Sequence, residues 1–191
     1  QRNLGGGEND VNAGDGAAAA QEAVTYEIIR GKLLAAADEM GVVLARTSMS
    51  PVIYEVLDFA CGIVDAEAQV ISQTNGITVF TGTFAGHVNN IIQRFGGDMR
   101  PGDIYMANDP YEGGTHLSDV AIIKPIFVDG EVIAYSIAVA HWTDIGGKVA
   151  GSLPMDATEI FHEGLRFTGH RIYDAGERCE DDMTIPATLR R

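Results

Sequence analysis

A two-residue turn between two long apolar segments constrains the fold of this chain more than any other feature. Asp129-Gly130 is a pair typical of a type I′ turn, in which both residues take positive φ. It lies between residues 120–128 and 131–140, which are rich in apolar residues, many of them β-branched. We therefore expect these segments to form one antiparallel hairpin. Because apolar residues crowd both strands, we expect both faces to be covered.

Other local patterns predict elements on either side of the hairpin. An apolar stripe at spacings of three and four predicts a long helix that ends near Thr47. Residues 59–64 and 69–73 are expected to be strands around a turn at residues 65–68. Residues 103–107 read as a short strand. Helices combined with an antiparallel hairpin predict an α+β fold with a mixed or antiparallel sheet.

Two further helices are expected from their ends. Thr83 is suited to cap a helix that continues through Phe95 and stops at a pair of glycines. Asp156 and Glu159 have the spacing of a capping pair, which predicts a short helix ending at Gly164. After residue 169 the periodicity fades, and no element is predicted there.

Composition sets limits on the class of protein. The chain has 191 residues, of which 46% are hydrophobic, so it can bury a core. Its formal net charge of −14 argues against nucleic acid or an anionic membrane as the main partner. The two cysteines, Cys61 and Cys179, have no metal-type spacing, and we see neither a transmembrane run nor a signal peptide. These features favour a cytoplasmic protein.

The first residues differ in composition from the rest of the chain. Residues 1–21 are rich in Gly, Asn, Asp and Ala, and such a segment cannot bury enough apolar surface to fold alone. We expect an extended N-terminal arm, held by another chain or lying along its own domain. Residues 22–191 then form the folded region.

Two short stretches concentrate the chemistry. The first runs from Asn108 to Asp119 and the second from Ala140 to Gly147, and each has a His three residues before an Asp and a Gly-Gly pair. A hairpin between them can bring the two stretches together. Imidazole and carboxylate are common ligands of divalent metals. Asp58 stands between two apolar residues, where a charge is costly unless it is paired or binds a cation.

These residues predict a metal site, although the pattern has structural alternatives. We expect Asp58, His116, Asp119 and His141 to bind one divalent metal, with Zn or Mn favoured and Fe possible. Asp144 is a candidate for orienting a ligating ring. A His near a strand end is also commonly a hydrogen-bonded residue, and an Asp after a Gly-rich loop is commonly a turn residue. His87 and His162 are interpreted as surface or packing residues, and His170 is assigned no role.

The chain resembles the N-terminal part of the hydantoinase B and 5-oxoprolinase B-type subunits, which are similar to subunits of ATP-dependent ketone carboxylases. The resemblance covers residues 22–191. It is carried by long ungapped motifs: Leu57-Asp58-Phe59-Ala60-Cys61, Arg100-Pro101-Gly102-Asp103, the two stretches described above, Gly151-Ser152, and Asp156 to Arg166.

The resemblance implies that the chain is part of one subunit of a multi-subunit enzyme. In the family, an actin-like ATPase subunit uses ATP and Mg to phosphorylate an amide or enolate oxygen, and the B-type subunit holds a metal for the later step. The family's metal ligands correspond to Asp58, His116, Asp119 and His141. Where the family often has a His, this chain has Phe80. Family subunits are usually far longer, so a separate chain carrying the remainder is a possible partner.

Further roles follow for residues around the expected metal. Asp144 or Asp109 could orient a ligand or relay a proton. Asn108, Thr115 and the amides of Gly113-Gly114 could stabilise an oxyanion or a phosphate, although the glycines could equally form only a tight turn.

Three functions are compatible with these residues. The first is a subunit of an ATP-dependent enzyme that hydrolyses a cyclic amide such as a hydantoin, 5-oxoproline or a lactam. The alternatives are a subunit of an ATP-dependent ketone carboxylase, and a non-catalytic assembly subunit without a metal. The chain has no Gly-x-x-x-x-Gly-Lys-Ser/Thr loop, so ATP with Mg is expected on a hydantoinase A-like partner.

Overall fold

A computed structural model describes residues 9–74 and 76–179 of the chain. Within them, one seven-stranded sheet has the order β2-β1-β5-β4-β3-β6-β7, and every neighbouring pair is antiparallel. The strands are β1 (Phe59–Asp65), β2 (Val70–Gln73), β3 (Ile104–Ala107), β4 (Asp119–Val128), β5 (Glu131–His141), β6 (His170–Asp174) and β7 (Glu177–Arg178). The predicted α+β fold is confirmed.

Four α-helices and three short 3₁₀ turns accompany the sheet in the described residues. The α-helices are α1 (Asn9–Thr47), α2 (Pro51–Tyr54), α3 (Thr78–Thr81) and α4 (Phe84–Phe95). The 3₁₀ turns are η1 (Gly96–Asp98), η2 (Pro110–Glu112) and η3 (Ile160–His162). None of the described helices is long and apolar enough to cross a membrane.

The predicted hairpin is confirmed as β4 and β5. Asp129 and Gly130 have φ of 51° and 87°, so both residues have the positive φ of the expected turn. The two strands stay paired along their whole length, from Val128 opposite Glu131 to Asp119 opposite His141. The hairpin therefore brings its two chemically active ends to the same edge of the sheet.

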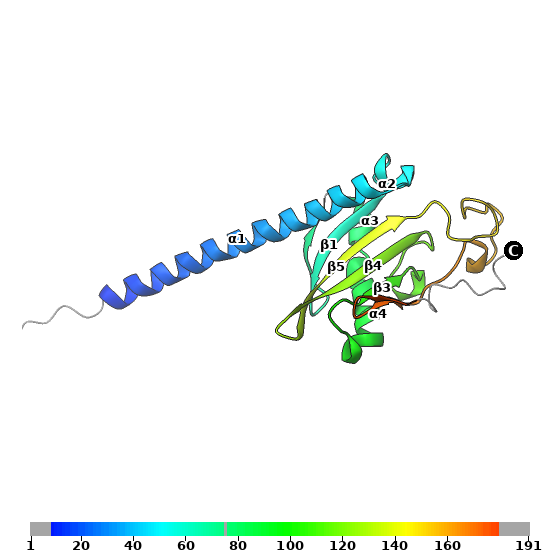
Figure 1. The fold of residues 1–191 in the computed structure, drawn as a ribbon. Helices are drawn as coiled ribbons and strands as arrows, with labels where there is room; N and C mark the ends of the chain where they lie inside the picture. The colour runs from blue at the N-terminus through cyan, green and yellow to red at the C-terminus, as the bar shows by residue number, and fades with distance from the viewer. Residues whose placement is uncertain (1–8, 75, 180–191) are drawn as a thin grey trace, which may run out of the picture.

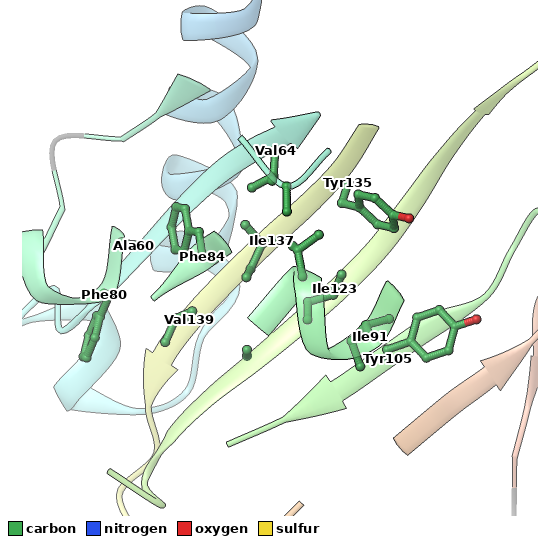
Figure 2. Packing of buried hydrophobic residues seen from close by; sticks show 13 residues of the cluster. Ala60, Val64, Phe80, Phe84, Ile91, Tyr105, Ile123, Tyr135, Ile137 and Val139 are labelled. Carbon is green, nitrogen blue, oxygen red and sulfur yellow. The ribbon is translucent and has the colours of Figure 1, made fainter. Parts of the chain in front are cut away.

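Both faces of the sheet are covered, as the apolar strands predict. Figure 1 shows α1 and α2 lying on one face of the sheet and α4 on the other, with much of α1 extending beyond the sheet. The α4 side holds the main core, in which Phe84 and Ile91 of α4 contact Ile123, Ile137 and Val139 of the hairpin (Figure 2). A position in β4 or β5 thus points either to the α4 face or to the α1 face, in alternation.

The extended arm predicted for residues 1–21 is wrong from Asn9 onward. Residues 9–21 belong to α1, which is 39 residues long. Alanine has the highest helix propensity, so the run Ala17 to Ala20 extends the helix toward the N-terminus, ahead of the apolar stripe. Residues 1–8 lie outside the described residues. The predicted end at Thr47 is confirmed.

Other differences lie mainly after the hairpin. The helix expected from Asp156 to Gly164 is a loop with only the short turn η3, and the Asp156 carboxylate pairs with the Lys148 ammonium at 2.5 Å instead of capping. The short strands β6 and β7 were not predicted. They pair with β3 and with each other at the edge of the sheet.

Candidate metal centre

Three neighbouring segments of the sheet bring Asp58, His141 and Asp119 to one edge. Asp119 is the first residue of β4 and lies opposite His141, the last residue of β5. Asp58 directly precedes β1, and its carbonyl oxygen accepts a hydrogen bond from the His141 N–H at 3.0 Å. The edge therefore gathers two carboxylate residues and an imidazole from distant parts of the sequence.

The side chains of this edge point to the α4 face. Ala60, Ala121 and Val139 belong to the core beneath α4. Asp119 and His141 each lie two residues from one of these positions along the same strand, and side chains two residues apart share a face. Asp58 stands two residues before Ala60, at the position next to His141. The cluster thus lies at the polar end of the α4 core.

Asp119 is the centre of the cluster. One carboxylate oxygen, Oδ1, lies 2.8 Å from Nδ1 of His141, and the other, Oδ2, lies 2.8 Å from Nδ1 of His116. Oδ2 also accepts hydrogen bonds from the hydroxyl of Thr115 and, at 3.2 Å, from the N–H of His116. Asp119 is 1% exposed. A single buried carboxylate therefore fixes both imidazoles.

The hydrogen bonds keep this carboxylate ionised. Burial by itself would raise the pKa of Asp119, because it disfavours the charged form. The hydrogen bonds from Thr115, His141 and His116 outweigh burial and hold the pKa below its ordinary value. Asp119 is thus an anion at neutral pH, which suits it to bind a cation or to orient basic rings.

The two imidazoles line a small cavity. It has a volume of about 220 Å³ and is bounded by His116, His141, Ser118, Glu163 and residues 152–155. The His116 side chain is 73% exposed and that of His141 is 23% exposed. Leu153 and Met155 are exposed apolar residues on the wall of this cavity. A ligand in the cavity would meet both rings and one apolar wall.

The donor atoms suit a divalent metal, but this structure joins only Asp119, His116 and His141 through their side chains, while Asp58 reaches His141 through its backbone carbonyl oxygen. Two imidazoles and two carboxylates are a set typical of Zn and Mn sites. Among the described residues, no group of three or more His, Cys, Asp or Glu side chains is arranged to hold a metal ion. The carboxylate of Asp119 hydrogen-bonds the two rings directly.

Asp144 does not orient either ring, contrary to our expectation. Its carboxylate accepts hydrogen bonds from the Gly146 N–H at 2.8 Å, the Ser152 hydroxyl at 2.9 Å and the Gly151 N–H at 3.0 Å. These bonds lower the pKa of the exposed Asp144 carboxyl, and the bond from the Gly146 N–H has the largest effect. Asp144 therefore shapes the loop that carries the cavity wall, and Asp119 orients the rings.

Asn108 and Asp109 are buried and already have structural partners. The Asn108 amide makes three hydrogen bonds to backbone groups of Leu117, Leu165 and Phe167. The Asp109 carboxylate accepts the Tyr111 N–H at 3.0 Å and pairs with Nε of Arg166 at 2.9 Å. In this structure both residues join the loop before β4 to other segments, and neither faces the cavity.

The paired glycines form a tight turn against α4. Gly113 has φ of +110°, and a Cβ atom there would lie 2.5 Å from the carbonyl carbon of Gly86. The Gly114 N–H is bonded to the carbonyl oxygen of Asp109 at 2.9 Å, so it is not free for an oxyanion. The turn alternative accounts for both residues. Of the residues expected to stabilise an anion, only Thr115 lies in the cluster.

One residue near the cluster was underestimated. His87 is 1% exposed on α4, and the charge of Asp119 acts on it. The sequence carries a signal for this position, because Phe84, His87, Val88 and Ile91 are spaced as one helix face. Of the two expected roles, surface or packing residue, the structure shows the packing position. His162 lies in η3, and its Nε2 is 3.2 Å from the Glu159 carboxylate.

The sequence is similar to that of known proteins over most of its length. It matches the family described as hydantoinase B/oxoprolinase over residues 22–190. The 5-oxoprolinase of Saccharomyces cerevisiae is 33% identical over 154 residues, which are 80% of this chain and 12% of that protein. Subunit beta of the caprolactamase of Pseudomonas jessenii is 32% identical over 168 residues, which are 88% and 29% of the two chains.

Solved structures agree with this similarity. The crystal structure of the ATP-dependent caprolactamase from Pseudomonas jessenii matches with a TM-score of 0.77 and 32% identity, over 84% of this chain and 28% of that one. Nucleotide-free acetone carboxylase matches with a TM-score of 0.75 over 84% and 21% of the two chains, and its 22% identity shows the fold alone. The chain spans 12 to 29% of the length of the curated relatives it matches. Since the family match extends through nearly the whole described fold, the chain belongs to the hydantoinase B/oxoprolinase family.

Proposed function

We propose that this chain is the metal-binding region of a B-type subunit in an ATP-dependent enzyme that hydrolyses a cyclic amide. The observation that carries the proposal is the Asp119 carboxylate, which holds the rings of His116 and His141 at 2.8 Å each beside a cavity. Asp58, His116, Asp119 and His141 would hold a divalent ion, Zn or Mn by ligand type, with Fe as a further candidate. A bound ion of this kind lowers the pKa of a water molecule and polarises a carbonyl or phosphoryl oxygen.

The chain's own side chains prepare this site. Asp119 holds both imidazoles close to its own carboxylate, and Thr115 fixes the carboxylate in turn. Binding of one ion by all four residues would replace these Asp119–imidazole hydrogen bonds with bonds to the ion. The positive charge of an ion would offset the two carboxylates, one of which is fully buried. Because the site lies at a sheet edge and not in the middle of the core, it can be loaded without disturbing the strand pairing.

The cavity indicates the size of the substrate. Its volume of about 220 Å³ is below the range of roughly 300–1,000 Å³ typical of sites for drug-sized ligands. A small ring therefore fits better than a peptide or an oligomer. Leu153 and Met155 would contact the apolar part of such a ring, while the amide group faces His116 and His141.

ATP is assigned to a partner. The sequence has no phosphate-binding loop of the Walker type, so we propose that a hydantoinase A-like subunit uses ATP and Mg to phosphorylate the amide oxygen. The exposed part of α1 is suited to contact a partner chain or the remaining part of the B-type subunit. Several large apolar side chains on it are more than half exposed: Val24, Tyr26, Ile28 and Ile29.

The relatives favour hydrolysis over carboxylation. The two proteins compared above at 32 and 33% identity are named for a lactam and for 5-oxoproline, both cyclic amides. The carboxylase has the same fold but only 22% identity. A non-catalytic assembly role would give the cluster around Asp119 only a structural part and predicts no bound metal.

Turnover with defined substrates tests the proposal. The protein, purified together with its ATPase partner, should hydrolyse ATP in response to small lactams, hydantoins or 5-oxoproline, and not in response to ketones with bicarbonate. His141→Ala should abolish the response, while His162→Ala, a half-buried imidazole outside the cluster, should retain it. Ketone-dependent ATP consumption would select the carboxylase. A full response of His141→Ala would overturn the assignment of the site.

A further inference from the structure

His87 occupies a position where an apolar side chain is expected. It lies on the face of α4 that packs on the sheet, between Phe84 and Ile91, both of which are fully buried in the main core. Figure 2 shows Phe84 and Ile91 directed toward the hairpin strands. The His87 side chain is 1% exposed, so solvent does not hydrate its ring.

The ring has no polar partner among the described residues. Neither Nδ1 nor Nε2 of His87 makes a hydrogen bond. Three other buried side-chain atoms lack a hydrogen bond, but each belongs to an ion pair: Asp109 with Arg166, Arg171 with Asp103, and Asp174 with Arg100. His87 is therefore the one described residue whose buried polar atoms have neither kind of partner.

This position is costly for stability. A buried polar group without a hydrogen bond costs about 1–3 kcal/mol, whereas an apolar group of similar shape costs nothing of this kind. A Phe or Leu at residue 87 would continue the apolar face of α4. A feature that lowers stability in this way calls for an explanation outside packing.

The surroundings of His87 supply that explanation. The side chains of Asp119 and His141 point to the face of the sheet that α4 covers, and the Asp119 charge acts on the His87 ring. Gly86, the preceding residue, packs against Gly113 in the loop that leads to His116. The close contact of these glycines holds the start of α4 against the loop that precedes His116. His87 therefore lies on the helix that covers the cluster's face of the sheet, within the range of the Asp119 charge.

We propose that His87 is a positioning residue of the metal site, a buried and unpartnered imidazole on the helix that covers this face of the sheet, which can hydrogen-bond the cluster when the site is loaded. The inference rests on the proposed metal site. When His116 and His141 bind an ion through their ring nitrogens, these rings are no longer available only as hydrogen-bond donors to Asp119. A neutral ring nearby then offers both an N–H donor and an acceptor without adding charge.

Metal affinity and stability, measured together on the full chain, test this role. His87→Phe should raise the melting temperature or leave it unchanged, because it removes the unpartnered polar atoms. The same variant should weaken Zn²⁺ affinity, measured by competition with a chelator, about tenfold or more, the loss typical of outer-shell partners. His87→Gln, which keeps a donor and an acceptor, should retain affinity to within about threefold by the same reasoning.

A matched control separates packing from polarity. Val88→Ala removes buried apolar contacts on the same helix face, so it should lower the melting temperature and leave Zn²⁺ affinity unchanged. If His87→Phe does not fold, His87→Leu is the apolar variant to measure. Wild-type affinity in the apolar variant would make His87 an ordinary core residue and would overturn this inference alone. A wild-type chain that binds no divalent ion would instead overturn the proposed function.

Discussion

Asn108 joins two loops beside the site, and replacing it with Ala removes three buried hydrogen bonds at once. Its amide nitrogen donates to the carbonyl oxygens of Leu117 at 2.6 Å and Leu165 at 2.9 Å, and its oxygen accepts from the Phe167 N–H at 2.6 Å. Asn108→Ala leaves these backbone groups without a partner. At about 1–3 kcal/mol for each unsatisfied group, less some recovery by water in a loop that is partly exposed, we expect a loss of roughly 3–5 kcal/mol.

Denaturant unfolding of the full chain measures this loss. Trp142 is the single tryptophan and lies next to the end of β5, so its fluorescence reports on the region that Asn108 supports. The urea midpoint should fall with an unchanged m-value. Asn89→Ala, an exposed change on α4, is the control and should alter stability by less than about 0.5 kcal/mol.

A second variant distinguishes the hydrogen bonds from the volume of the side chain. Asn108→Asp keeps the acceptor for Phe167 but places an acceptor where both carbonyl oxygens need a donor, so it should destabilise at least as much as Asn108→Ala. A loss below about 1 kcal/mol in both variants would refute the reasoning, because it would mean that the three bonds contribute nothing beyond those made with water.

Three further predictions concern the backbone, pH and the site. Gly113→Ala should destabilise the chain by roughly 2–5 kcal/mol in chemical unfolding, because of its φ of +110° and the contact with α4, whereas Gly97→Ala, with open space around it, should be near neutral. Burial lowers the pKa of His87 from 6.5 to about 4, although the negative charge of Asp119 acts to raise it. Between these two pH values the unfolded chain therefore binds more protons than the folded chain. The free energy of unfolding is then highest above pH 6.5 and decreases as the pH falls toward 4, and His87 contributes at most about 1.4 kcal/mol per pH unit to this decrease. A His87→Phe chain with the same pH dependence of its melting temperature would contradict this. His116→Ala should abolish turnover and leave the circular dichroism spectrum unchanged, because this side chain is 73% exposed.

The hairpin shows what short-range signals can predict. Asp129-Gly130 identified the turn, and pairing outward from it brings Asp119 opposite His141 without further information. The end of α1 follows from a helical period and its stop signal, and the bounds of α4 follow from the residues at its two ends, although the Thr83 side chain makes no capping hydrogen bond. The proximity of Asp58 is different, because it depends on β1 pairing with β5, which lies some eighty residues away in the sequence.

The parts that sequence analysis missed depend on tertiary contacts. β6 and β7 are short strands without apolar alternation, and they form where β3 offers β6 a partner and β6 offers one to β7. Asp144 has the spacing of a His partner, but its carboxylate accepts hydrogen bonds from N–H groups of its own loop. His87 lies on an apolar helix face that the sequence does reveal. The influence of the Asp119 charge on His87 could not be predicted in this way, because it depends on how α4 packs on the sheet.

Elemental analysis of the purified full chain tests the central claim most directly. The chain, dialysed against Zn²⁺ or Mn²⁺ and then freed of loose ions, should retain about one divalent ion per molecule, as expected for a four-ligand site of this composition. Asp119→Asn removes the charge that holds His116 and His141 but keeps the shape of the side chain, so it should reduce the retained metal to background. Metal at background in the wild-type chain, or undiminished metal in Asp119→Asn with a folded spectrum, would contradict the account.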